Sequence, residues 1–387
     1  MPALSLKSLA GKLGLLIAAL AASLILLEAA TRLLSDIHPS LALRDPLVGK
    51  THTPGFEGEV FVEEAGRPIH LRFNREGFRG PDVAYQASTG TRRIAVIGDS
   101  MVAAVESDEH DTAVAELEQL LNQSDSERRW EVLNFGVAGS STGQELVLYR
   151  ELVRRYRPDL VIVVYFMGND FSDNSRRLSN NPRIYFELDA EGRLVQQPYS
   201  VASKKLSVWL NENSRFYVWQ KATMKTLRHG FAPRSGDRIF DPEPDQMLAQ
   251  AWRLNAALLE SFREAVFEDG ARLVLVLCPA GGQVYDDMWE RVLERADEDA
   301  HRYDRDYPRG RLGRIAAAAA IPILDLTPSL RAARGAAVAA ALAPDQRLYL
   351  AGGEGHLSAR GNLEVALAVH RFLVEGDGRA TFDEVRF

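Results

Sequence analysis

Four short segments of the sequence carry residue types that together could perform acyl transfer. They are Gly98-Asp99-Ser100, residues 134–139 (Asn-Phe-Gly-Val-Ala-Gly), Gly168-Asn169-Asp170 and Glu354-Gly355-His356. A serine hydroxyl needs a base before it can attack a carbonyl carbon, and the oxyanion that then develops needs hydrogen-bond donors already aimed at it. Ser100 and His356 could supply the nucleophile and the base, while Gly139 and Asn169 could supply the donors.

The elements that must position these residues follow an alternating strand and helix pattern. Short apolar runs predict strands at 93–97, 130–135, 159–166, 272–277 and 321–326. Helical periodicity predicts helices at 112–121, 143–156, 245–267, 285–320 (interrupted near 307–308) and 361–374. This alternation predicts an α/β fold with a doubly wound, mostly parallel sheet flanked by helices. Ligands of such sheets bind at the carboxyl ends of the strands, where three of the four segments begin.

In this order the segments resemble the consensus blocks of SGNH/GDSL hydrolases. The matching stretches are 93–100 (Arg-Ile-Ala-Val-Ile-Gly-Asp-Ser), 134–139, 168–170 and 356–361 (His-Leu-Ser-Ala-Arg-Gly), so that the resemblance spans about residues 92–374. Residues 74–80 (Asn-Arg-Glu-Gly-Phe-Arg-Gly) also resemble a segment that precedes the first block in membrane-anchored bacterial members. The resemblance implies an SGNH-hydrolase, flavodoxin-like fold. It also implies the site roles, which are Ser100 as nucleophile and backbone donor, Gly139 as second backbone donor, Asn169 as side-chain donor and His356 as base.

One departure from the family pattern concerns the acid that orients the histidine. The family usually has this acid three residues before the histidine, where the chain has Gly353. Glu354 is expected to take its place, holding the imidazole tautomer and stabilising the imidazolium. A backbone carbonyl or Asp345 could orient His356 instead, or the acid could be absent. The last case leaves open a catalytically inactive, membrane-tethered protein that binds carbohydrate or serves in assembly.

A rival nucleophile lies in the same sequence. Residues 139–143 (Gly-Ser-Ser-Thr-Gly) fit the Gly-x-Ser-x-Gly elbow, which would make Ser141 the attacking residue. The same glycines are also typical of a flexible strand-to-helix turn. Neither a dinucleotide fingerprint nor a P-loop lysine is present, and no clustered histidine and carboxylate spacing suggests a metal. We therefore expect no cofactor and no metal.

Composition excludes several other classes of protein. The 387 residues are 46% hydrophobic and 26% charged, which is ordinary for a globular protein. A net charge of −7 without a basic block argues against nucleic acid as a partner. The single cysteine, Cys278, lies in an apolar run, so we expect a small buried side chain and no internal disulfide.

The N-terminus differs from the rest of the chain. Lys7 and Lys12 precede an apolar stretch at 13–27, a pattern shared by signal peptides and membrane helices. Cleavage after Ala30 is disfavoured, because Glu28 stands where signal peptidase prefers a small residue. We therefore expect a retained single-pass anchor in the cell membrane, with the catalytic domain on the periplasmic, extracytoplasmic side. A cleaved signal and a buried soluble helix are the alternatives.

The predicted organisation has three parts. Residues 1–34 form the anchor, 35–90 a small β-containing extension, and 91–387 the catalytic domain with an insertion at about 172–244. Within the insertion, residues 189–192 predict a hairpin turn. The apolar residues of 206–227 predict a helix that covers the core, with a substrate lid or a membrane-touching surface as alternatives.

The predicted function is that of a serine-dependent acyl ester hydrolase, an esterase or deacetylase, acting outside the cytoplasm. A polysaccharide O-acyltransferase would use the same residues and is the alternative. The expected partners are an acyl ester substrate, with carbohydrate and lipid esters as candidates, and the membrane.

Overall fold

The computed structural model of the chain describes residues 6–34, 41–179, 181–199, 205–229, 235–335, 347–350 and 355–375. They fall into two compact units. One comprises Met1–Leu41 and Ala202–Gly230, and the other comprises Ala42–Val201 and Phe231–Phe387. The second unit holds the sheet and all the candidate catalytic residues that the structure describes, so we take it first.

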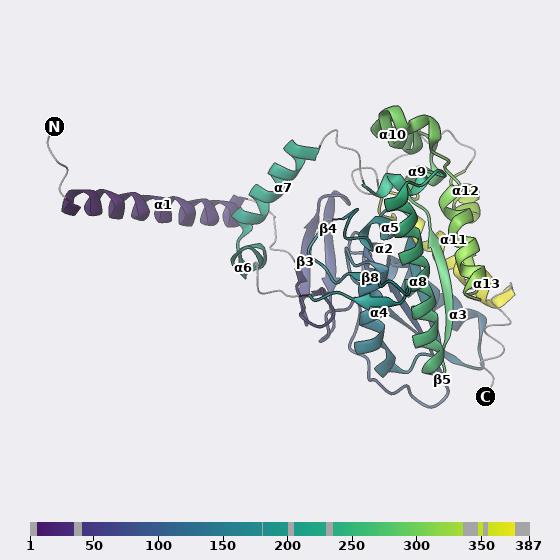
Figure 1. Ribbon diagram of the computed structural model, residues 1–387. Coiled ribbons are helices and arrows are strands. Elements are labelled where there is room, and N and C mark those ends of the chain that lie inside the picture. The colour runs from purple at the N-terminus through teal and green to yellow at the C-terminus, as the bar shows by residue number, and fades with distance from the viewer. Residues whose placement is uncertain are drawn as a thin grey trace. The chain divides into compact units, whose positions relative to one another are not determined.

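A parallel five-stranded sheet forms the centre of the second unit (Figure 1). Its order is β11-β10-β7-β5-β6, and every neighbouring pair is parallel. In chain order this is the 2-1-3-4-5 arrangement of flavodoxin-like folds. The prediction of a doubly wound, mostly parallel sheet is confirmed. The strands are β5 (Thr91–Gly98), β6 (Arg129–Gly136), β7 (Leu160–Phe166), β10 (Arg272–Cys278) and β11 (Ile323–Asp325).

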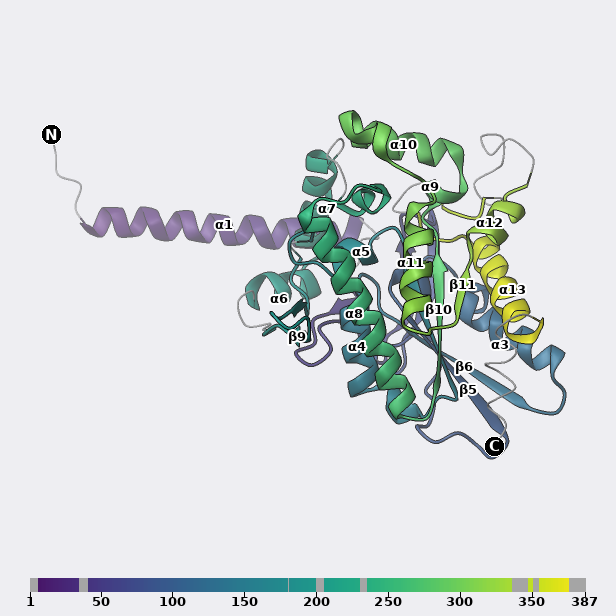
Figure 2. The same ribbon diagram turned by 45° about the vertical axis from the view of Figure 1, so that its right-hand side comes forward.

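Helices cover both faces of the sheet (Figure 2). On one face lie α4 (Thr142–Glu151), α8 (Gln246–Glu268) and α11 (Tyr307–Ala318); on the other lie α3 (Ala113–Ser124), α12 (Thr327–Ala333) and α13 (Ala359–Glu375). Because successive side chains of a strand point to opposite faces, each strand contributes to both cores. In β7, Val163 joins the first core and Val164 the second, and Cys278 is buried in the second as predicted.

The long helical tract predicted at 285–320 is divided in the structure. It forms α10 (Asp286–Ala296), a 3₁₀ turn and α11, with Pro308 in the first turn of α11. Proline fits this position because the first turn has no intrahelical partner for a backbone N–H. The break predicted near residues 307–308 is therefore confirmed.

The edge strand β6 is protected by side chains of α3. Asn122 Oδ1 accepts the backbone N–H of Trp130 at 3.0 Å, and Glu118 Oε2 accepts that of Val132 at 2.7 Å. These edge groups are therefore not available to pair with another strand, which limits edge-to-edge association.

The segment before the sheet contains the predicted β element. Two short strands, β1 (Ala42–Leu43) and β2 (Thr51–His52), pair with each other, and β3 (Glu57–Val62) forms an antiparallel hairpin with β4 (Arg67–Arg72). A further hairpin joins β8 (Phe186–Leu188) to β9 (Leu194–Gln196). Its turn at Asp189 is the one predicted from the sequence, and the Asp189 carboxylate accepts the backbone N–H groups of Glu191 and Arg193.

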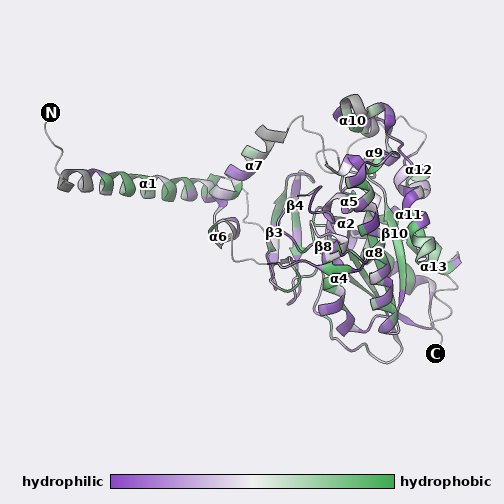
Figure 3. Cartoon of the chain, in the orientation of Figure 1, coloured by the Kyte–Doolittle hydropathy of each residue, from purple (hydrophilic) through white to green (hydrophobic). Residues whose placement is uncertain are grey.

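The described residues of the first unit form the helices α1 (Leu6–Leu34), α6 (Lys205–Asn213) and α7 (Arg215–His229). The segment Gly11–Leu34 is long and apolar enough to cross a membrane, and Figure 3 shows that most of its residues are hydrophobic. The tract at 206–227, which was predicted to cover the core, forms α6 and α7, and these helices group with α1. Leu206, Trp209, Trp219 and Met224 are exposed.

Candidate active site

The predicted nucleophile and the predicted base lie close together at the carboxyl end of the sheet. Ser100 begins the short helix α2 (Ser100–Ala103), directly after β5 and the N-cap Asp99. The Asp99 side chain accepts the backbone N–H of Met101 at 2.9 Å and so fixes the start of this turn. His356 lies just before α13, and its Nε2 is 2.9 Å from Ser100 Oγ. The pair is therefore at hydrogen-bond distance, as a nucleophile and its base must be.

Two carboxylates lie at the other nitrogen of the imidazole. Nδ1 of His356 is 2.6 Å from Glu64 Oε2 and 3.3 Å from Glu106 Oε1. Since Nδ1 carries one proton at most, the shorter contact makes Glu64 its hydrogen-bond acceptor and leaves Glu106 as a second nearby charge. The predicted acid Glu354 and its alternative Asp345 lie outside the described residues.

Glu64 was missed by the sequence reasoning, and no motif could have found it. It lies in the loop between β3 and β4, 292 residues before its histidine partner. Ion pairs hold this hairpin against the loop that follows α2. Arg67 pairs with Asp108 at 2.8 Å, and Arg72 pairs with Glu109. The extension therefore reaches into the active site.

The segment at 74–80 supports the loop that carries Glu106. The buried guanidinium of Arg79 donates to the backbone oxygens of Ala104 at 3.0 Å and Ser107 at 2.7 Å. Burial lowers the pKa of Arg79 to about 10, which leaves it charged at neutral pH. Arg79 thus holds a positive charge near the Glu106 carboxylate.

The carboxylates change the titration of the base. Burial acts to lower the pKa of His356, but the hydrogen bond to Glu64 and the charge of Glu106 outweigh it and raise the pKa to about 9. For the Glu106 carboxyl, burial has the opposite effect and raises the pKa. Ligand atoms of Glu64, Glu106 and His356 lie within 4.8 Å of one another, a spacing that could also hold a metal ion. The position of Nε2 against Ser100 fits proton transfer.

The loop after β6 brings Gly139 to the same edge. Val137 donates its backbone N–H to Gly98 O at 3.0 Å, which ties this loop to the end of β5 just before the nucleophile. Gly139 has φ +71°, a conformation that favours glycine. Gly136 allows close packing beneath, since a Cβ there would lie 2.1 Å from Ala103 N.

Asn169 follows β7, on the other side of β5, and caps the short helix α5 (Asp170–Asp173). Its side-chain amide lies close enough to Asp99, the neighbour of Ser100, to act on the pKa of that carboxyl. Burial raises the pKa of Asp99, while the backbone N–H of Met101 and the Asn169 amide act to lower it.

Two residues of the extension contact the peptide next to Gly139. Lys50 Nζ donates to Ala138 O, and Ala138 N donates to His52 Nε2 at 3.4 Å. His52 Nδ1 is 3.1 Å from Gly77 O, and burial together with the charge of Lys50 lowers the pKa of His52 to about 4. His52 is therefore neutral, with Nδ1 as the donor and Nε2 as the acceptor.

The rival serine is differently placed. Ser141 precedes α4, is 1% exposed, and its hydroxyl has no hydrogen-bond partner among the described residues. A nucleophile needs both access to substrate and a base within reach. The structure gives Ser141 neither, whereas Ser100 faces His356.

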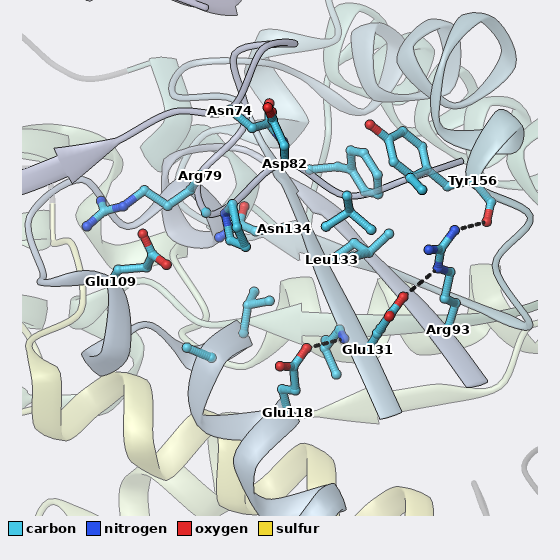
Figure 4. Close-up of a pocket in the computed structure, with 18 of the residues that line it drawn as sticks. Asn74, Arg79, Asp82, Arg93, Glu109, Glu118, Glu131, Leu133, Asn134 and Tyr156 are labelled. Atoms are coloured by element: carbon cyan, nitrogen blue, oxygen red, sulfur yellow. Dashed lines mark hydrogen bonds and ion pairs between the residues drawn. The ribbon is translucent and has the colours of Figure 1, made fainter. Parts of the chain in front are cut away.

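A hollow of about 460 Å³ runs along β6 and is separate from this site (Figure 4). Its charged side chains are largely satisfied by protein groups. Arg93 pairs with Glu131 at 2.8 Å and donates to Tyr156 O at 3.0 Å, and Glu118 holds the edge of β6. We assign this hollow a structural role.

No protein-family model and no curated protein matches the sequence. Similar solved structures include the acetyl xylan esterase AlAXEase (13% identity, 72% of this chain and 97% of that one, TM-score 0.39). TesA is 15% identical over 73% of this chain and 98% of its own, with a TM-score of 0.36. A catalytic mutant of Axe2, an acetylxylan esterase from Geobacillus stearothermophilus, is 14% identical over 72% and 93%, with a TM-score of 0.38. Similarity this low carries no argument about activity, which must rest on the site itself.

Proposed function

We propose that the protein is a serine-dependent acyl ester hydrolase of the SGNH type. The observation that carries this proposal is the hydrogen-bonded series Ser100–His356–Glu64, with contacts of 2.9 and 2.6 Å. Glu64 takes the orienting role expected of Glu354. Its carboxylate holds the Nδ1 proton, so that Nε2 is free to accept the proton of Ser100.

The reaction proceeds in two acyl transfers. Ser100 Oγ attacks the ester carbonyl carbon while His356 Nε2 takes its proton, and the backbone N–H groups of Ser100 and Gly139 with the Asn169 amide stabilise the oxyanion. Collapse of the tetrahedral intermediate breaks the ester bond, and His356 gives the proton to the leaving alcohol. Water, deprotonated by His356, then attacks the acyl-serine. The bond between the acyl carbon and Ser100 Oγ breaks, His356 returns the proton to Oγ, and the carboxylic acid is released.

Transfer to a polysaccharide hydroxyl would use the same residues, with the sugar oxygen in place of water. The choice depends on whether the site excludes water and binds an acceptor. A catalytically inactive binding protein is disfavoured, because such a protein has no need for a serine, a histidine and a carboxylate in hydrogen-bonded series.

The cellular placement is part of the proposal. The apolar helix of Gly11–Leu34 anchors the chain in the cell membrane, and Lys7 and Lys12 keep its N-terminus in the cytoplasm. The catalytic unit then acts on the extracytoplasmic side. A reporter that is active only outside the cytoplasm, fused after Phe387, should be active.

The experiment that tests the activity is a panel of acyl esters of carbohydrates and lipids, assayed with the purified full-length chain and its Ser100→Ala variant. Free acid should appear with the wild type only. Adding a sugar acceptor distinguishes hydrolysis from transfer, because transfer would move the acyl group to the acceptor. If well-folded wild type cleaves none of the esters and does not react with a fluorophosphonate, the protein is not a serine hydrolase.

A further inference from the structure

The helices α6 and α7 interrupt the catalytic sequence but group with α1. Glu28 of α1 makes this connection. Its carboxylate accepts hydrogen bonds from Ser214 Oγ at 2.7 Å and from the backbone N–H groups of Arg215 and Phe216 at 3.1 Å. Arg32, one turn further along α1, donates to Asn213 O at 2.9 Å. A carboxylate at the first turn of α7 satisfies helix N–H groups and favours the positive end of the helix dipole.

The position of Glu28 along α1 fixes where these helices lie relative to a bilayer. The segment Gly11–Leu34 has 24 residues. At 1.5 Å per residue it is about 36 Å long, against a hydrocarbon core of about 30 Å. Counted from Gly11, Glu28 lies about 26 Å and Arg32 about 32 Å along the helix. With the N-terminal lysines on the cytoplasmic side, Arg32 therefore reaches the outer headgroup region and Glu28 lies just below it. Helices held by Glu28 and Arg32 must therefore start at that surface.

The exposed side chains of α6 and α7 suit such a surface. Leu206 is 70% exposed and Trp209 57%, and the two lie three residues apart on one face of α6. On α7, Trp219 is 45% exposed and its ring stacks on Phe216 with 5.9 Å between centroids. Tryptophan is enriched at membrane interfaces, where the apolar ring and the polar N–H find different surroundings.

Charge favours the same partner. Between Ala202 and Gly230 the sequence has one acidic residue, Glu212, and the basic residues Lys204, Lys205, Arg215, Lys221, Lys225 and Arg228. The chain as a whole carries −7, so this basic excess is local. Basic helices with tryptophan and leucine on their surface are typical of helices that lie in the interface of anionic membranes.

We propose that α6 and α7 form a membrane-interface foot (Lys205–His229), docked on the outer end of α1 and lying in the headgroup layer of an anionic phospholipid bilayer. The foot rests on the proposed anchor and is independent of the ester chemistry. It gives the chain two attachments to one membrane surface.

The test uses the full-length chain in vesicles of equal parts phosphatidylcholine and phosphatidylglycerol, with phospholipids brominated near the top of the acyl chains to quench tryptophan fluorescence. Of the five tryptophans, Trp130 and Trp252 are buried in the catalytic unit and Trp289 is partly buried there. Quenching should therefore come from Trp209 and Trp219. The double variant Trp209→Phe/Trp219→Phe should lose most of it, whereas Trp289→Phe should keep it. Replacing phosphatidylglycerol by phosphatidylcholine should weaken it.

Equal quenching in the double variant and the wild type would overturn the proposal. A raised KM for soluble esters in the double variant, without any quenching in the wild type, would instead show a substrate lid. Alkaline extraction of the same vesicles distinguishes failure of the anchor from failure of the foot. If the chain is released, the anchor and the foot both fail; if it is retained without quenching, the foot alone fails. Fluorophosphonate labelling of the same samples reports the hydrolase separately.

Discussion

The candidate active site is built from two regions that differ in how they are positioned. Ser100, Gly139 and Asn169 stand at the ends of β5, β6 and β7, adjacent parallel strands whose register is fixed by the sheet. The extension before the sheet contributes Glu64 from the β3–β4 loop, His52 from the short strand β2 and the preceding Lys50, and single hydrogen bonds connect these residues to the site.

In the proposed reaction the two regions have different roles. The sheet would supply the groups that touch the reacting atoms, where small displacements are costly. The extension would supply groups that act through others, by orienting His356 or by supporting the Ala138 peptide. Substitutions in the sheet-borne region should therefore have the larger effects, with Glu64 as the exception because its contact to the base is charged and short.

The largest effect is expected at the nucleophile. Ser100→Ala should abolish esterase activity and fluorophosphonate labelling, because the oxygen that forms the acyl bond is gone. Ser141→Ala is the matched control and should keep labelling, since its hydroxyl is buried away from any base in the described structure. Labelling that survives in the first variant and disappears in the second would make the elbow serine the nucleophile.

The next effect concerns the oxyanion. Asn169→Ala should lower kcat by roughly 100- to 1,000-fold with little change in KM, as expected for a donor that acts mainly in the transition state. Asn181→Ala, a substitution of an exposed asparagine in the same unit, should leave both constants unchanged. A change confined to KM would make Asn169 a substrate-binding residue.

The pH profile tests the effect of the neighbouring carboxylates on His356. Below its pKa of about 9, His356 is protonated and cannot accept the proton of Ser100. Values of kcat/KM should therefore rise with pH, and their midpoint should lie well above 6.5. Removing a negative charge destabilises the imidazolium, so Glu64→Gln should move the midpoint to lower pH while lowering the plateau. A midpoint that does not move would show that Glu64 does not face the base.

The smallest effect is expected at Lys50, which acts through the Ala138 peptide. Lys50→Met keeps much of the side-chain stem but removes the donor to Ala138 O. A hydrogen bond from a charged group contributes roughly 1.5–3 kcal/mol. Because only part of that free energy would stabilise the transition state, kcat should fall by about tenfold. Arg44→Met is the control, because Arg44 binds Pro182 O instead. An unchanged kcat would show that the contact of Lys50 to the Ala138 peptide does not affect the reaction.

The sheet and the sheet-borne residues could be predicted because their signals are local. An apolar run such as 160–166 fixes a buried strand, and the residue that follows it must lie at the edge where ligands bind. The hairpins were predictable for the same reason, since alternation and turn residues are read over a few positions.

The rest of the site depended on tertiary contacts that carry no local signal. Glu64 lies in an ordinary hairpin loop, and only the packing of that hairpin against Asp108 and Glu109 brings it to His356. The grouping of the tract at 206–227 with α1 could not be predicted either, because apolar spacing alone does not identify the partner of a helix. Glu28 contacts the start of α7 in the structure, whereas in the sequence it indicated only that cleavage was disfavoured.

The most direct test of the account compares the acid found in the structure with the acid expected from the sequence. The rate of fluorophosphonate labelling would be measured for the wild type, Glu64→Gln and Glu354→Gln at one pH. Labelling reports the attack by Ser100 alone. We expect Glu64→Gln to slow labelling by roughly 10²- to 10⁴-fold, and Glu354→Gln to react close to the wild-type rate. Slow labelling of Glu354→Gln with normal labelling of Glu64→Gln would contradict this expectation, and would show that Glu354 is the acid that orients His356.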